Sequence, residues 1–263
     1  MTDNEIISLN IAQFAMIYFL LLIILFVMKK YKIDQTKLLF VASVRMTVQL
    51  VLAGLILTYI FENPHPIFTV IYIFVMTGFA IYLTLQRNKS INKTFKIIVG
   101  ISLAASGISV VCFFIVIIVG ASLFNPQYTI PISGMIIGNA LTGVSLGVKT
   151  FSENIYSQRI KIDALINMGV TPQKILTPFV SQAIETALLP TLNSMVGMGI
   201  ISLPGMMTGQ ILSGTMPMTA IFYQIAIIIA ISAVTCLAVF CSLFFGYRTL
   251  YNKRCQMIYM TLT

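Results

Sequence analysis

Two charged residues stand apart from the other charges of this sequence. Arg45 interrupts an otherwise uncharged run from Leu38 to Phe61, and Glu185 interrupts another from Thr177 to Ile201. A charged group inside a membrane-spanning segment is costly and usually faces protein or water, so both are functional candidates. Each lies at a similar distance from the basic end of its run, about 10 Å along a helix. An Arg45–Glu185 ion pair is therefore the structural alternative to a direct role in transport.

A second group of polar residues lies among glycines. The stretch Gly134–Gly147 contains two Gly-x-x-x-Gly units together with Asn139, Thr142 and Ser145. Small residues at this spacing let helices approach closely in lipid, which predicts a helix at the centre of a bundle. Packing alone is the alternative explanation for these glycines.

One charged segment, Thr150–Leu176, separates two apolar runs. Its apolar residues recur at helical spacing, and Gly169-Val-Thr-Pro172 combines a residue that ends helices with a pair that begins them. We expect a helix, a tight turn and a short helix at the membrane surface. An ordinary amphipathic linker has the same pattern.

The segment Ser202–Met218 is rich in Gly, Pro and Met and too apolar to lie fully in water. It is a candidate for re-entry into the membrane against other protein segments. The six methionines between Met195 and Met218 favour packing, with soft-metal binding as the alternative.

The sequence lacks the residues that several kinds of chemistry require. His65 is the single histidine, and the cysteines (Cys112, Cys236, Cys241, Cys255) form no Cys-x-x-Cys pair. Neither a metal-ligating histidine pair nor a disulfide framework is indicated. The stretch Gly143–Thr150 fails the phosphate-loop pattern, which needs adjacent Gly-Lys. We therefore expect no ATP hydrolysis by this chain, and no cofactor bound to it.

The elements that carry these residues are membrane spans. The chain is 58% hydrophobic and 9% charged, too few charges to cover a water-facing surface. A span needs about 20 mostly apolar residues. Seven runs approach or exceed that length, which predicts an all-α polytopic protein: Ile6–Met28, Leu38–Phe61, Pro66–Gln86, Ile97–Phe124, Ile130–Val148, Thr177–Ile201 and Thr219–Tyr247.

The charge of +9 is confined to one side of these spans. Basic clusters begin at Lys29, Arg87, Lys149 and Arg248, and the loops between them carry none. The positive-inside rule places the amino terminus outside and the carboxyl terminus, with Lys253 and Arg254, in the cytoplasm. The distribution predicts a multi-pass inner-membrane protein and argues against nucleic-acid binding. A rhodopsin-like protein would need a lysine in the last span, and a secondary transporter would show an inverted repeat; neither is present.

We therefore treat residues 1–263 as one transmembrane domain. Residues 1–96 form scaffold spans one to three, and residues 97–148 form spans four and five. Residues 149–176 form the cytoplasmic segment, and residues 177–263 contain spans six and seven, the outer segment and the tail.

Several stretches resemble those of a known class of transport proteins. The cytoplasmic run Asp163–Gln173 looks like the Glu-Ala-Ala…Gly loop of ABC-transporter permeases, with Asp163 where Glu is usual. Gly134–Gly147, Leu189–Met195 and Val196–Gly214 resemble the FetB-type iron-export ABC permeases, which are related to the plant aluminium-resistance permeases. Glu185 departs from the family pattern.

The resemblance implies ATP-driven alternating access by a homodimer of permeases with two cytoplasmic ATPase subunits, which would bind ATP and Mg²⁺. Residues expected to couple to the ATPase are Asp163, Ala164, Gly169, Thr171, Pro172 and Gln173. Polar residues expected to line the pathway are Asn139, Thr142, Asn193, Ser194 and Gln210. Iron or another metal is the expected cargo. An organic solute such as a sugar nucleotide, or a receptor or channel without an ATPase, are the alternatives.

Overall fold

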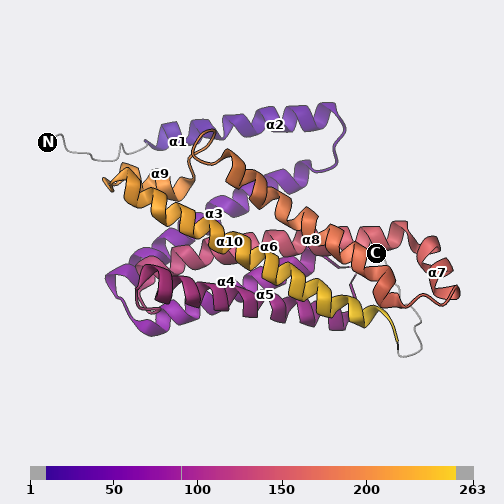
Figure 1. Ribbon diagram of the computed structural model, residues 1–263. Helices are drawn as coiled ribbons and strands as arrows, with labels where there is room; N and C mark the ends of the chain where they lie inside the picture. The colour runs from indigo at the N-terminus through magenta and orange to yellow at the C-terminus, as the bar shows by residue number, and fades with distance from the viewer. Residues whose placement is uncertain (1–9, 90, 253–263) are drawn as a thin grey trace.

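The computed structural model describes residues 10–89 and 91–252, and these residues form helices without a β-strand (Figure 1). The predicted Lys253, Arg254 and Cys255 lie outside the described residues. The helices are α1 (Ile11–Ile17), α2 (Phe19–Lys30), α3 (Thr36–Glu62), α4 (Pro66–Arg87), α5 (Lys93–Phe113), η1 (Phe114–Val119), α6 (Pro126–Ser157), α7 (Arg159–Asn167), α8 (Pro172–Gly197), α9 (Gly205–Leu212), α10 (Pro217–Gly246) and η2 (Tyr247–Leu250).

Seven helical segments of the described chain are long and apolar enough to cross a membrane, which confirms the predicted all-α class and the number of spans. The first is interrupted at Tyr18, between α1 and α2. The fourth continues from α5 into a π-helical turn, η1, which ends at Gly120 with a φ of 69°. The inside–outside orientation stays a prediction.

The core of the molecule is a bundle of α4, α5, α6, α8 and α10. Its closest approach depends on glycines of α6. A Cβ on Gly143 would overlap the Thr235 side chain of α10, and one on Gly147 would lie 2.9 Å from Val239 Cγ1 and 3.4 Å from Ala187 Cβ. The second predicted Gly-x-x-x-Gly unit therefore packs helices within the chain. In the first unit only Gly134 meets another helix, since a Cβ there would lie 3.7 Å from the Met76 sulfur of α4, whereas Gly138 has no atom within 4 Å of its Cβ position.

The bundle is closed at its basic end by α5 and α10. Phe95 packs edge-to-face with Phe151, their ring centroids 6.2 Å apart, and its ring fills the space that a side chain at Gly246 would need. Asn92 caps α5 by accepting a hydrogen bond from the Phe95 N–H at 2.9 Å, and donates to the Thr249 carbonyl at 3.1 Å. These contacts fix the end of the bundle from which α7 projects.

The amino-terminal helices lie outside this bundle. Figure 1 shows α1 and α2 running apart from the other helices, joined to α3 by a short turn. No residue of α2 is buried, and Ile60 is the buried residue of α3. The tie between these helices is a hydrogen bond between the Tyr18 and Thr47 hydroxyls.

The cytoplasmic segment differs from the prediction in one respect. A helix, α7, does end in a turn at Gly169, whose φ is 85°, and the next helix begins at Pro172. The predicted short second helix is wrong, because α8 continues without interruption to Gly197. Pro178 and Pro190 lie inside α8 and remove backbone donors without ending it.

The outer segment folds back on the bundle. After α8, the short helix α9 lies beside the first turns of α10 (Figure 1), with Met207 buried. Whether this segment re-enters the membrane stays a prediction.

Candidate functional site

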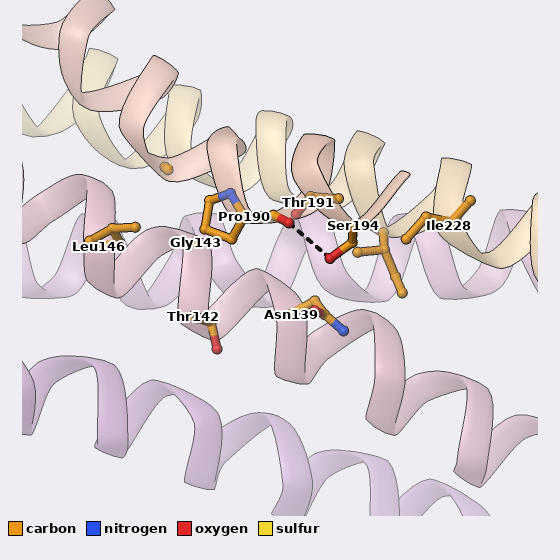
Figure 2. A pocket seen from close by; sticks show the side chains of 10 residues that line it. Asn139, Thr142, Gly143, Leu146, Pro190, Thr191, Ser194 and Ile228 are labelled. Atoms are coloured by element: carbon orange, nitrogen blue, oxygen red, sulfur yellow. Dashed lines mark hydrogen bonds between the residues drawn. The ribbon is translucent and has the colours of Figure 1, made fainter. Parts of the chain in front are cut away.

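A pocket of about 100 Å³ lies at the seam between α6, α8 and α10 (Figure 2). Its polar lining comes from Asn139 and Thr142 of α6 and from Thr191 and Ser194 of α8. Apolar residues complete it: Gly143, Leu146, Ala187, Pro190, Ile228 and Ile231. Three residues predicted for the pathway, Asn139, Thr142 and Ser194, are therefore brought together from helices more than forty positions apart in the chain.

The local sequence explains how this pocket opens. Gly143 lets α6 approach α10 closely at Thr235. Pro190 forms part of the pocket wall and interrupts the backbone hydrogen bonding of α8 at the same level. The pocket therefore lies where α6 approaches α10 closely and where the backbone hydrogen bonding of α8 is interrupted.

The polar groups of the pocket present oxygen atoms. The Thr142 hydroxyl donates to the Gly138 carbonyl at 3.1 Å, and the Ser194 hydroxyl donates to the Pro190 carbonyl at 2.9 Å, the dashed line in Figure 2. The Asn139 amide nitrogen donates to the Met135 carbonyl at 2.8 Å. Since these donors are used within their own helices, the remaining oxygen lone pairs can accept a hydrogen bond or coordinate a cation.

Thr191 is a pocket residue that the sequence analysis missed. It precedes Ser194 by three positions on the same helix, which places the two side chains on neighbouring positions of one face. That spacing was the available signal.

Two residues predicted for the pathway lie elsewhere. Asn193 is exposed on α8 and does not line the pocket. Gln210 lies in α9, and its side-chain oxygen is buried without a hydrogen-bond partner among the described residues. Neither position tests the role predicted for these residues.

The Arg45–Glu185 pair is not formed within the single chain. The Arg45 guanidinium lies 5.4 Å from the centre of the Phe79 ring, a cation–π contact. The ion pairs among the described residues include Lys149–Glu153 at 3.8 Å and Arg159–Asp163 at 4.0 Å. Arg45 and Glu185 are both exposed, because their helices direct these side chains away from the bundle.

The predicted coupling residues gather around the α7–α8 turn. Asp163 pairs with Arg159 within α7, and Ala164 is exposed on that helix. The Gly169 N–H donates to the Ile166 carbonyl at 2.9 Å, which closes the end of α7. Thr171, Pro172 and Gln173 begin α8, where the Gln173 carbonyl accepts from the Thr177 hydroxyl at 2.7 Å and Thr171 makes no side-chain capping bond.

The exposed side of α7 carries an apolar ridge that the sequence analysis did not identify. Ile160 of α7 is 88% exposed, and two exposed residues flank the helix: Tyr156 in the last turn of α6, and Met168, which follows the last residue of α7 and is 78% exposed. Ile162 on the opposite side is buried and anchors α7 to the bundle. Within α7, Ile160 and the exposed Ala164 are four positions apart and share one helix face; with Tyr156 and Met168 they form the ridge.

Two of the methionines between Met195 and Met218 accept hydrogen bonds, whereas Met216 and Met218 are exposed. The Met195 sulfur accepts from the Ser232 hydroxyl at 3.4 Å, and the Met198 sulfur accepts from the Gln224 amide at 3.8 Å. In the part of the chain that the structure describes, no group of three or more His, Cys, Asp or Glu side chains could hold a metal ion.

Comparison with known proteins identifies the family. The model of the "Uncharacterised protein family (UPF0014)" matches residues 11–251, which includes every described helix. The chain belongs to this family. It is 32% identical to the "Probable iron export permease protein FetB" of Escherichia coli (strain K12), over 81% of this chain and 82% of that protein.

Other UPF0014 relatives come from bacteria and plants. The chain is 31% identical to the "UPF0014 membrane protein YjkA" of Bacillus subtilis (strain 168), over 82% of this chain and 86% of the relative. It is 33% identical to the "Protein ALUMINUM SENSITIVE 3" of Arabidopsis thaliana, over 70% of this chain and 66% of the relative. No solved structure matches the chain. These findings confirm the predicted family and a multi-pass membrane protein.

Proposed function

We propose that this UPF0014 protein is the membrane permease subunit of an ABC transporter that exports iron or another metal, driven by a separate ATPase subunit. The observation that carries the proposal is α7, a short helix with an exposed apolar ridge at the basic end of the bundle. The Escherichia coli relative is named an iron export permease protein, which supports the assignment as a permease subunit.

The geometry of α7 suits a docking element. Its ridge, defined as Tyr156, Ile160, Ala164 and Met168, begins in the last turn of α6, after the apolar run Ile130–Val148. Exposed apolar surface of this kind marks a protein contact. Because the Gly169 turn joins α7 directly to α8, movement of the ridge would be transmitted to the span that carries Pro190 and Ser194.

The seam pocket suits a small cargo. Pockets for drug-sized organic ligands have volumes of roughly 300–1,000 Å³, against about 100 Å³ here. Its available groups are amide and hydroxyl oxygens, which are ligands of hard cations. Size and chemistry therefore favour a metal ion over a sugar nucleotide. Two copies of the chain and two ATPases, each binding ATP and Mg²⁺, would complete the transporter.

Co-purification with the candidate ATPase tests the docking element. We expect the wild-type chain, extracted from membranes, to retain the ATPase. The double variant Ile160→Glu with Met168→Glu should reduce retention by about tenfold or more, because a charge replaces an apolar anchor at each position. Tyr31→Glu is the matched control, since Tyr31 is 70% exposed at the same end of the molecule. A stably folded wild type that retains no ATPase would overturn the proposal and favour a receptor or channel.

ATPase stimulation in reconstituted vesicles tests the cargo. We expect Fe²⁺ to stimulate the wild-type complex, and Thr142→Val with Ser194→Ala to weaken that stimulation. Thr58→Val is the control, because Thr58 makes the same hydroxyl-to-carbonyl bond in α3 but lies outside the pocket. Stimulation by a sugar nucleotide and not by metals would assign the permease to organic solutes.

A further inference from the structure

Two charged side chains lie within the spans without an oppositely charged partner among residues 10–89 and 91–252. Arg45 and Glu185 are exposed, and neither takes part in the ion pairs of the described residues. A carboxylate facing lipid at this depth is unfavourable, and residues of this kind almost always face protein or a water-filled cavity. Each residue therefore needs cover that the single chain does not provide.

The first half of the outward face of α8 is polar, whereas its second half exposes Leu189, Leu192 and Val196. Ser181, Gln182 and Glu185 are exposed on α8. The corresponding surface of α10 carries exposed Phe222, Ile229 and Phe240, which lipid can solvate. The contrast indicates that protein covers α8 on the side of Glu185, while lipid covers α10.

The charges of Arg45 and Glu185 and their depths in the spans indicate what covers them. Arg45 lies eight residues after Lys37, and Glu185 lies eleven residues after Lys174, the lysines at the basic ends of their spans. These separations are about 12 Å and about 16 Å along a helix. Both side chains are long enough to bridge the difference. Arg45 and Glu185 therefore lie at similar depths along their spans, as an ion pair between them requires.

We infer that a second copy of this chain covers the face, with Arg45 of each copy paired with Glu185 of the partner subunit. A two-fold interface is reciprocal, so one contact of this kind gives two ion pairs. The inference rests on the proposed function only in requiring two permease copies. It assigns Glu185 to the subunit interface and not to the lining of the pocket.

The same interface would complete the seam. Asn139 and Thr142 lie on the exposed face of α6, beside Gly138, which has open space around it. A partner helix can approach closely at such a glycine. The pocket of each copy would then be closed by the partner, and α8 would join the coupling turn, the ion pair and the pocket along one helix.

Cross-linking in native membranes tests the pairing. The chain is first freed of its native cysteines by replacement with serine. Two differently tagged copies are then co-expressed, one with Arg45→Cys and one with Glu185→Cys, and treated with a short bismaleimide. We expect a product carrying both tags, and none when Leu237→Cys of α10 replaces Arg45→Cys. Absence of a doubly tagged product, when both variants reach the membrane at the wild-type level, would overturn the inference.

Charge exchange provides a second test. Arg45→Glu and Glu185→Arg alone each place like charges opposite one another, and we expect the dimer fraction in detergent to fall by about tenfold or more. The double exchange should restore it to within about twofold of wild type. If the double variant is no better than the singles, the pair does not exist. Retention of the ATPase is measured in parallel, so loss of the pairing and loss of the permease assignment are distinguished.

Discussion

The amino-terminal helices and the central bundle are built from similarly apolar sequence but pack differently. No residue of α2 is buried, whereas α6 buries residues along its whole length, from Pro126 to Ile155. The fifth and sixth spans are in fact less hydrophobic than the first. Lipid tails are as apolar as these side chains, so moving a side chain from lipid into a helix–helix contact gains little free energy. Hydrophobicity alone therefore does not draw helices together in a membrane.

Small residues account for the difference. The bundle helices meet at Gly143, Gly147, Ala183 and Ala187, where backbones come close enough for extensive van der Waals contact. The amino-terminal helices expose Leu, Ile and Phe, which hold neighbouring backbones apart and are well solvated by lipid. Substitutions matched between the two regions should therefore have very different effects.

The largest effect is expected from an aromatic truncation. Phe151→Ala removes a fully buried ring that packs against Phe95, and should lower the free energy of unfolding by about 3–5 kcal/mol. Phe40→Ala, in α3 near the same end of the molecule, removes an exposed ring and should cost about 0.5 kcal/mol or less. Thermal unfolding of the detergent-solubilised variants measures both. Equal losses would show that the amino-terminal helices pack as tightly as the bundle.

Overpacking a glycine is the next test. Gly143→Leu would force α6 away from Thr235 and should cost about 2–3 kcal/mol, while Gly54→Leu meets open space in α3 and should be tolerated. Gly138→Leu sharpens the comparison, because it too meets nothing within its own chain. It should leave the monomer stable and weaken association of two copies, as measured by light scattering. A Gly143→Leu variant as stable as Gly54→Leu would contradict the packing explanation.

A smaller effect is expected where the bundle ends. Asn92→Ala removes the cap of α5 and the hydrogen bond to Thr249, and should lower stability by about 1–2 kcal/mol. Asn125→Ala is the control, since Asn125 accepts from the Gln127 N–H at an exposed helix start without a second contact. Amide exchange near Thr249 should rise in the first variant alone.

Much of the fold could be predicted from composition and charge. Seven apolar runs bounded by basic residues were sufficient for the spans, and Gly169 with Pro172 was sufficient for the turn between α7 and α8. Hydrophobicity could not predict that α4, α5, α6, α8 and α10 form the bundle while α1, α2 and α3 lie outside it. The relevant signal for α6, α8 and α10 was the small residues at their contacts; it does not single out α4, which has fewer Gly, Ala and Ser residues than α3.

The candidate site was predictable only where polarity coincided with those small residues. Asn139 and Thr142 lie beside Gly138 and Gly143, and they do meet Ser194 in one pocket. Arg45 and Glu185 were matched by depth, but depth does not give the direction in which a helix points its side chain. The ridge on α7 was missed because exposed and anchoring apolar residues alternate there, so a one-dimensional pattern does not separate Ile160 from Ile162.

The smallest effect is expected at the tie between the amino-terminal helices. Tyr18→Phe removes the hydrogen bond to Thr47, and should change bundle stability by about 0.6 kcal/mol or less, the typical value for such bonds in membranes. Its effect should instead be local, since α1 and α2 have little other contact with α3. Proteolysis at the α2–α3 turn should accelerate while thermal unfolding of the bundle stays unchanged. A lower unfolding temperature of the whole molecule would mean that the amino-terminal helices support the bundle through contacts beyond this bond.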